Sequence, residues 1–137
     1  MSKKAPELEI DVTEVVDHLR FTGGFASALA EVVKRKITAE AAKKQGTTVS
    51  DAELQKAADV FRVDRGLYKA SETDKWLRSN GLSVEGFEAY LETSLLINKF
   101  KDALVAKADL QKYLSSRVVK SVTREAVYED WFAKAAK

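Results

Sequence analysis

Proline occurs only once in this sequence of 137 residues, at Pro6, and glycine occurs six times. Proline breaks helices because it lacks a backbone N–H and its ring clashes with the preceding turn, and glycine weakens them through its conformational freedom. Helices can therefore form almost anywhere after residue 6. No run of alternating apolar and polar residues is long enough to indicate a strand. The sequence predicts an all-α protein of about six or seven helices.

Apolar residues recur along most of the chain with the spacing of one helix face. The predicted helices cover residues 11–21, 25–45, 50 to about 66, 71 to about 80, 83–106 and 123–137, with a short helix after Asp109. Ser50 and Glu53 have the spacing of a capping box, in which each side chain accepts a hydrogen bond from the other residue's backbone N–H. Ser71 and Asp74 form a weaker version of this pattern, and Ser83 is the predicted cap of the helix that follows.

The longest predicted helix, residues 83–106, is apolar on more than one side at its middle, where Leu95, Leu96 and Ile97 follow one another. A helix that is apolar so far around its circumference usually packs against neighbours on several sides. We therefore expect residues 95–97 to be buried, with Phe100 close by, in the central helix of the fold.

Two glycines, Gly23 and Gly24, separate the first two predicted helices. We interpret them as a turn between helices, because glycine adopts positive φ angles at little cost. The alternative is the double-glycine site at which some exported peptides are cut after their leader.

The charges are nearly balanced, with 23 Lys and Arg against 21 Asp and Glu. This balance does not indicate a nucleic-acid partner, and we interpret the lysines between residues 34 and 44 as a solvated helix face. No apolar run is long enough to span a bilayer, and none follows the basic start as in a secretory signal. We therefore expect no nucleic-acid partner and no membrane insertion. The expected location is the cytoplasm, or the periplasm if a signal has been removed.

The residue types that most catalytic and metal centres need are scarce. Cysteine is absent and there is a single histidine, His18, so neither a cysteine-ligated nor a multi-histidine metal site can form. Asp17 is adjacent to His18 and so does not face it on a helix. Most carboxylates occur in first helical turns, where capping explains them. We predict no catalytic residue, no metal and no cofactor.

Three aromatic residues, Tyr128, Trp131 and Phe132, occur close together in the last predicted helix. Their spacing prevents all three from facing the same way. Trp131 continues an apolar stripe with Val127 and Ala135, so we expect Trp131 to dock. Tyr128 and Phe132 would then lie on the other face, beside a binding site.

The segments 32–46, 49–54, 80–91 and 95–100 together resemble the N-terminal helical domain of SurA-like peptidyl-prolyl isomerases and chaperones. Four features match: a long predicted helix that ends at Gly46, a capping box that begins at Val49-Ser50, a helix start at Gly81-Leu82-Ser83, and a helix that contains Leu95-Leu96-Ile97. In the region 32–46 the chain is similar to proteins of bacterial peptide-maturation and export systems.

The resemblance implies a single compact bundle over residues 11–137, after a flexible N-terminus at residues 1–10, with a C-terminal helix that returns onto the bundle. The chain leaves no room for the parvulin domain of the catalytic relatives, so we expect no isomerase activity. The resemblance implies instead a chaperone-like module or recognition scaffold that binds unfolded or precursor polypeptides. The candidate peptide-binding residues are Phe25, Leu29, Phe61, Tyr90, Tyr128 and Phe132.

An alternative function is that the chain is itself a ribosomal precursor. Its helical leader would then be recognised by a peptide-modifying enzyme, and the modified segment would lie near residues 127–137. The sequence does not indicate an oligomeric state.

Overall fold

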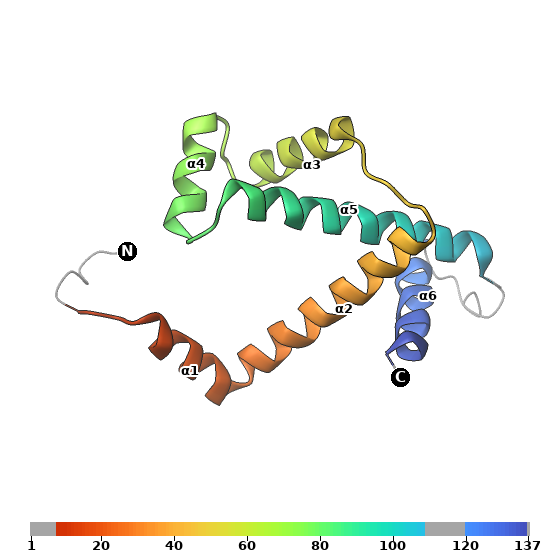
Figure 1. The fold of residues 1–137 in the computed structure, drawn as a ribbon, viewed down its shortest axis with the longest axis horizontal. Coiled ribbons are helices and arrows are strands. Elements are labelled where there is room, and N and C mark those ends of the chain that lie inside the picture. Colours follow the sequence, from red (N-terminus) through yellow and green to blue (C-terminus); the bar gives the residue numbers. More distant parts are fainter. Residues whose placement is uncertain (1–7, 109–119, 137) are drawn as a thin grey trace. The chain divides into compact units, whose positions relative to one another are not determined.

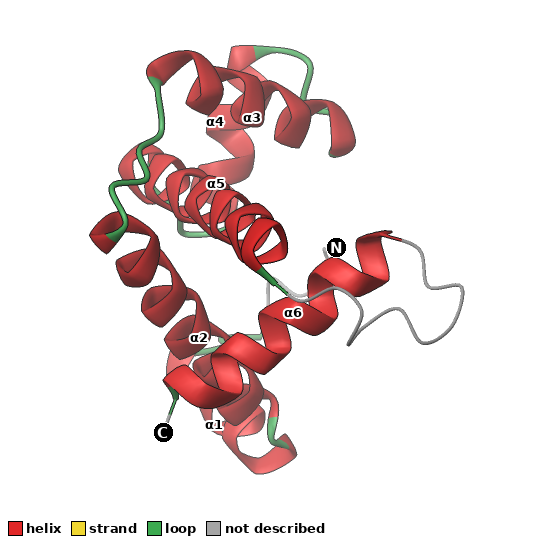
Figure 2. Cartoon of the chain, turned by 90° about the vertical axis from the view of Figure 1, so that its right-hand side faces the viewer, coloured by secondary structure: helices red, strands yellow, loops and turns green. Residues whose placement is uncertain are grey.

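The computed structural model describes residues 8–108 and 120–136, and all its regular structure is helical, with no strand in these ranges (Figures 1 and 2). The helices are α1 (Val12–Thr22), α2 (Gly24–Lys44), α3 (Asp51–Asp64), α4 (Ala70–Ser79), α5 (Val84–Lys107) and α6 (Lys120–Ala135). The predicted all-α class is confirmed. The short helix expected after Asp109 lies outside the described residues.

Two of the three serine caps form as the sequence predicts. The Glu53 backbone N–H donates to Ser50 Oγ at 3.1 Å, and the Ser50 N–H donates to Glu53 Oε1 at 2.9 Å. Ser83 Oγ likewise accepts from the N–H of Gly86 at 2.9 Å.

The cap predicted at Ser71 is wrong, because the N-cap of α4 lies two residues earlier, at Lys69. Lys69 occupies the N-cap position in an extended conformation, and its backbone N–H donates to Glu72 Oε1 at 2.9 Å. Glu72 has one methylene more than Asp74, so its carboxylate reaches back over three residues as a capping box requires.

Glu53 also connects α3 to α5. Its carboxylate accepts from Lys99 Nζ at 2.7 Å, and the same ammonium donates to the Thr48 carbonyl at 2.7 Å. The hydrogen bond from Lys99, followed by that from the Ser50 backbone, lowers the pKa of Glu53 from 4.5 to about 2. The carboxylate that completes the N-terminal capping box of α3 therefore also makes a tertiary contact with α5.

The chain divides into two compact units, Met1–Lys34 and Arg35–Lys137. In the first unit α1 is followed by the start of α2, with the predicted turn at Gly23, whose φ of 86° is left-handed. None of the residues of α1 is buried. The expectation of a single domain over residues 11–137 stays a prediction.

The second unit is organised around α5, against which α3, α4 and α6 pack. Its core brings Ala39 and Ala42 of α2 against Leu96 and Phe100 of α5. The expected burial of residues 96, 97 and 100 is confirmed. The expectation for Leu95 is wrong: it is half-buried. Three consecutive residues span about 200° of a helix, so one of them turns toward the edge of the core.

The C-terminal helix returns onto this core, as expected (Figure 2). Arg124 donates from Nε to Asp102 Oδ1 at 2.8 Å and from Nη2 to the Asn98 carbonyl at 3.0 Å, which fixes α6 on α5. On the other side the hydroxyls of Thr38 and Tyr128, both buried, lie 3.0 Å apart and connect α2 to α6.

Candidate functional site

An open cavity of about 350 Å³ lies in the second unit, where α3, α4 and α5 meet. Four of its lining residues are aromatic, and the lining consists of Phe61, Arg65, Trp76, Leu82, Gly86, Phe87 and Tyr90. We call this feature the aromatic cavity. It presents an almost wholly apolar surface to solvent with a single charged group.

The aromatic walls support one another. Phe61 of α3 packs edge-on against Trp76 of α4, with ring centroids 5.5 Å apart, and against Phe87 of α5 at 4.9 Å. Each edge-to-face pair contributes about 0.5–1.5 kcal/mol beyond the burial of apolar area. Because the three rings come from three helices, they hold the cavity open and also hold those helices together.

A tight turn between α4 and α5 places the remaining apolar wall. Gly81 has a φ of 68°, which glycine adopts without strain. The turn lets the Leu82 N–H bond the carbonyl of Leu77 at 2.8 Å, and the Leu77 side chain is buried beneath it. Leu82 is thereby held at the cavity while nearly half of its surface stays exposed, at 47%.

Two guanidinium groups lie on the aromatic rings. The Arg65 guanidinium carbon is 3.6 Å from the Phe61 ring centroid and 5.9 Å from that of Trp76. Arg35 lies 4.4 Å above the ring of Tyr90 and donates to the Tyr90 carbonyl at 3.2 Å and to Ser94 Oγ at 3.0 Å. These contacts orient Tyr90, which is 54% exposed at the edge of the cavity.

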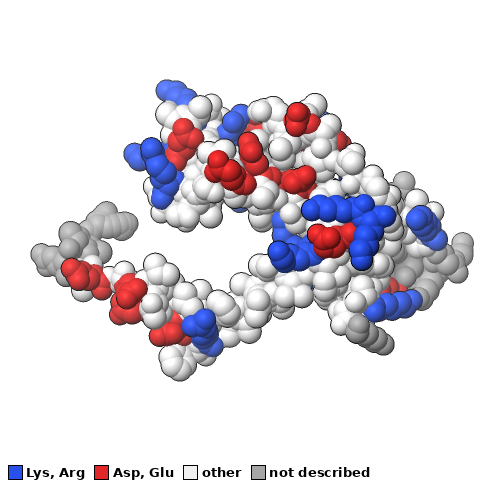
Figure 3. Space-filling view, in the orientation of Figure 1, with Lys and Arg blue, Asp and Glu red and all other residues white. Residues whose placement is uncertain are grey.

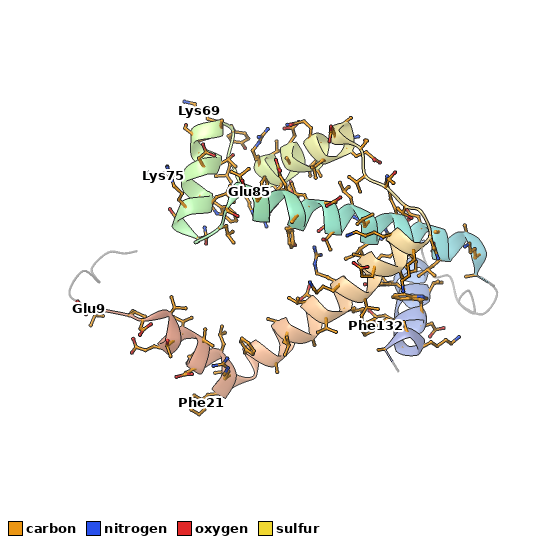
Figure 4. All side chains as sticks on the ribbon, viewed as in Figure 1. Glu9, Phe21, Lys69, Lys75, Glu85 and Phe132 are labelled. Carbon is orange, nitrogen blue, oxygen red and sulfur yellow. The ribbon has the colours of Figure 1, made fainter. Side chains whose placement is uncertain are left out.

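Acidic and basic side chains lie among one another over this part of the surface (Figure 3). Lys69 and Lys75 project from α4, and Glu85 lies at the start of α5 (Figure 4). A second, more polar cavity of about 340 Å³ shares Phe87 with the aromatic cavity and has Asp51, Asp74 and Glu88 in its lining. Phe87 therefore separates an apolar cavity, with Arg65 in its described lining, from a cavity whose lining holds these three carboxylates and Arg62.

The structure brings together only two of the six predicted binding residues, Phe61 and Tyr90, which both line the aromatic cavity. Phe25 and Leu29 belong to the first unit. Leu29 is exposed, and the Arg20 guanidinium covers the Phe25 ring at 4.7 Å.

The other two predicted residues, Tyr128 and Phe132, lie on α6. Trp131 docks as expected, with its ring 4.8 Å from that of Phe100. Tyr128 is also buried, so the expectation that it lies on the face opposite Trp131 is wrong. Residues three apart on a helix are only about 60° apart around its axis, and both side chains reach the core. Phe132 is half-buried beside Trp131 (Figure 4).

The predicted binding residues do not include Arg65, Trp76, Leu82 or Phe87, which also line the aromatic cavity. The available signal is the occurrence of one aromatic residue on each of three successive helices, beside the Gly81 turn. That pattern indicates packing, but it does not show that the packed rings leave an opening.

Residues 16–101 match the family model of SurA-like N-terminal domains. This match covers more than half of the chain and all the residues of the aromatic cavity, and the chain belongs to this family. No curated protein and no solved structure matches the chain.

Two searches of the described residues gave negative results. They contain no cluster of three or more histidine, cysteine, aspartate or glutamate side chains that could hold a metal ion. Among the helices described, none is both long and apolar enough to cross a membrane.

Proposed function

We propose that this SurA-like domain is a non-catalytic module that binds unfolded or precursor polypeptides, and that the aromatic cavity takes up an apolar side chain of the bound chain. The observation that carries the proposal is an apolar cavity that is open to solvent and lined by four aromatic residues. Its volume, about 350 Å³, is at the lower end for ligand sites. It suits one or two side chains of an extended peptide.

The lining supports a binding role over a catalytic one. Among the described lining residues, only Arg65 and Tyr90 carry ionisable side chains. Arginine and tyrosine exchange protons poorly near neutral pH, so the cavity offers no ready general base. The edge-to-face rings supply apolar contact area instead.

The affinity expected from such a site is modest. Burial of one large apolar side chain contributes about 1.5–3 kcal/mol, and association costs several kcal/mol of lost freedom. One cavity therefore gives weak, reversible binding, as a module that releases its client requires. Lysines of α2, such as Lys36, Lys43 and Lys44, would attract acidic clients and raise the association rate more than the affinity.

The proposal is tested by titrating the protein into a fluorescently labelled, permanently unfolded polypeptide and following the anisotropy of the label. We expect saturable binding that the Tyr90→Ala variant weakens by about fivefold or more, as for an aromatic residue at a binding site. Tyr68→Ala is the matched control, because Tyr68 is 75% exposed and outside the cavity lining. No saturable binding, or equal effects of the two variants, would contradict the proposal.

A further inference from the structure

We propose that the apolar side chain held in the aromatic cavity is accompanied by a carboxylate of the same peptide, which Arg65 binds. This inference rests on the proposed peptide-binding function and specifies the chemistry of the client. The carboxylate could be the side chain of an aspartate or glutamate next to the apolar residue, or the free C-terminus of the peptide. Both present the same group to the guanidinium.

Arg65 is positioned as an anion receptor by its aromatic contacts. The Arg65 guanidinium carbon lies 3.6 Å from the centroid of the Phe61 ring, a distance at which the ring covers one side of the group. The five N–H donors lie in the plane of the group, so stacking leaves them available at its edge. A stacked guanidinium has also lost part of its side-chain freedom before binding, which lowers the entropic cost of pairing with a carboxylate.

The described part of the chain provides Arg65 with no carboxylate partner. By contrast, Arg62 of α3 pairs with Asp59, and Arg20 of the first unit pairs with Asp17. Arg35 donates hydrogen bonds from its guanidinium group to Ser94 Oγ and to the Tyr90 carbonyl. The Arg65 guanidinium lies instead on the rings of Phe61 and Trp76 at the cavity.

Charge complementarity determines where the carboxylate lies. Among the described residues that line the aromatic cavity, Arg65 is the only charged one. On the other side of Phe87, the second cavity has three carboxylates, Asp51, Asp74 and Glu88, against one guanidinium, Arg62, in its lining, so its net charge repels an anion. A bound acidic peptide therefore places its carboxylate at the α3 side of the aromatic cavity, beside Arg65.

The test compares peptides of equal length that are blocked at both ends and differ at one position after a single leucine: glutamate, glutamine or lysine. A fourth peptide ends in leucine with a free carboxylate. We expect the glutamate peptide to bind about threefold to tenfold more tightly than the glutamine peptide, and the lysine peptide more weakly than either. The preference should shrink at 1 M salt.

Arg65→Gln should remove the preference for glutamate while changing the affinity for the glutamine peptide little. Arg65→Lys should restore part of the preference, because lysine keeps the charge but not the planar donors. Arg78→Gln is the matched control, an exposed arginine of α4 outside the lining. Melting curves of each variant verify the fold.

The outcomes separate the two proposals. If no peptide binds, the peptide-binding function itself fails. If the peptides bind with equal affinity, or if Arg65→Gln keeps the glutamate preference, the carboxylate inference fails and peptide binding stands. Tighter binding of the free-carboxylate peptide alone, lost in Arg65→Gln, supports the inference and assigns the carboxylate to the client's C-terminus.

Discussion

Phe100 is the residue on which we expect the C-terminal helix to depend most. It is 1% exposed, and its ring lies 4.8 Å from that of Trp131 at an interplanar angle of 67°. It also contacts the core that joins α2 to α5. Replacing Phe100 by alanine therefore removes core packing and the ring against which α6 docks.

The magnitude follows from these two losses. A buried phenylalanine replaced by alanine costs roughly 3–5 kcal/mol in the free energy of unfolding, including the cavity it leaves. About 0.5–1.5 kcal/mol of that comes from the edge-to-face pair with Trp131. Whole domains are stable by only about 5–15 kcal/mol, so Phe100→Ala should leave the protein close to unfolding.

The assay is urea unfolding followed by circular dichroism at 222 nm. A double-mutant cycle of Phe100→Leu with Trp131→Leu measures the ring pair alone, because leucine keeps most of the apolar volume. The control is Val60→Ala, since Val60 is exposed on α3 and its replacement should change the stability by less than about 0.5 kcal/mol. A Phe100→Ala effect below about 1 kcal/mol, or a cycle without coupling, would refute the docking of α6 through these rings.

Two further predictions concern pH and local stability. The pKa of Glu53 is about 2 in the folded protein and 4.5 without the fold. The ionised carboxylate therefore contributes fully to the stability of the fold above pH 4.5, and this contribution is lost as the pH falls toward 2. The melting temperature of Glu53→Gln should therefore lie below that of the wild type at pH 7 and converge with it near pH 2; a constant difference would contradict the assignment. In hydrogen exchange, the amides of α1 should exchange much faster than those of α5, because α1 buries none of its residues. Equal protection would show that the apolar side chains of α1 are covered in solution.

The sequence predicts the helices well because their signals are local. The Ser50 and Ser83 caps need only residues three positions away, and the scarcity of proline leaves the segments between them uninterrupted. The error at Ser71 is also local: Glu72 competes with Asp74 as the carboxylate that caps, and the longer side chain reaches the backbone.

Rotation of a helix about its axis is harder to predict. The stripe through Trp131 is correct, yet Tyr128 is buried beside it because its hydroxyl meets that of Thr38, a residue 90 positions earlier in the sequence. Leu95 and Leu96 are the same residue type on the same helix, yet only Leu96 is buried in the core, and Leu95 is half-buried. These outcomes depend on the packing of distant segments, which periodicity alone does not specify.

The candidate site is less predictable than the fold for the same reason. Phe61 and Tyr90 are among the predicted binding residues and both line the cavity, but the lining also includes Trp76 and the leucine held by the Gly81 turn. Arg65 carries no recognisable motif at all. Its proposed role depends on the packing of the end of α3 against a ring of α4, and this tertiary contact cannot be read from the sequence around Arg65.

The two parts of α5 line different features, so the proposed peptide binding and the stability of the fold can be tested separately. Its first part supplies Phe87 and Tyr90 to the aromatic cavity, and its second part supplies Leu96 and Phe100 to the core under α6. Tyr90 and Phe100 are ten residues apart, or about 15 Å along the helix axis. Substitutions at that separation usually act independently. Loss of an exposed ring at the cavity should therefore weaken the proposed peptide binding without releasing α6. Loss of the buried ring should release α6 and destabilise the fold, and peptide binding should then fall only with the fraction of unfolded protein.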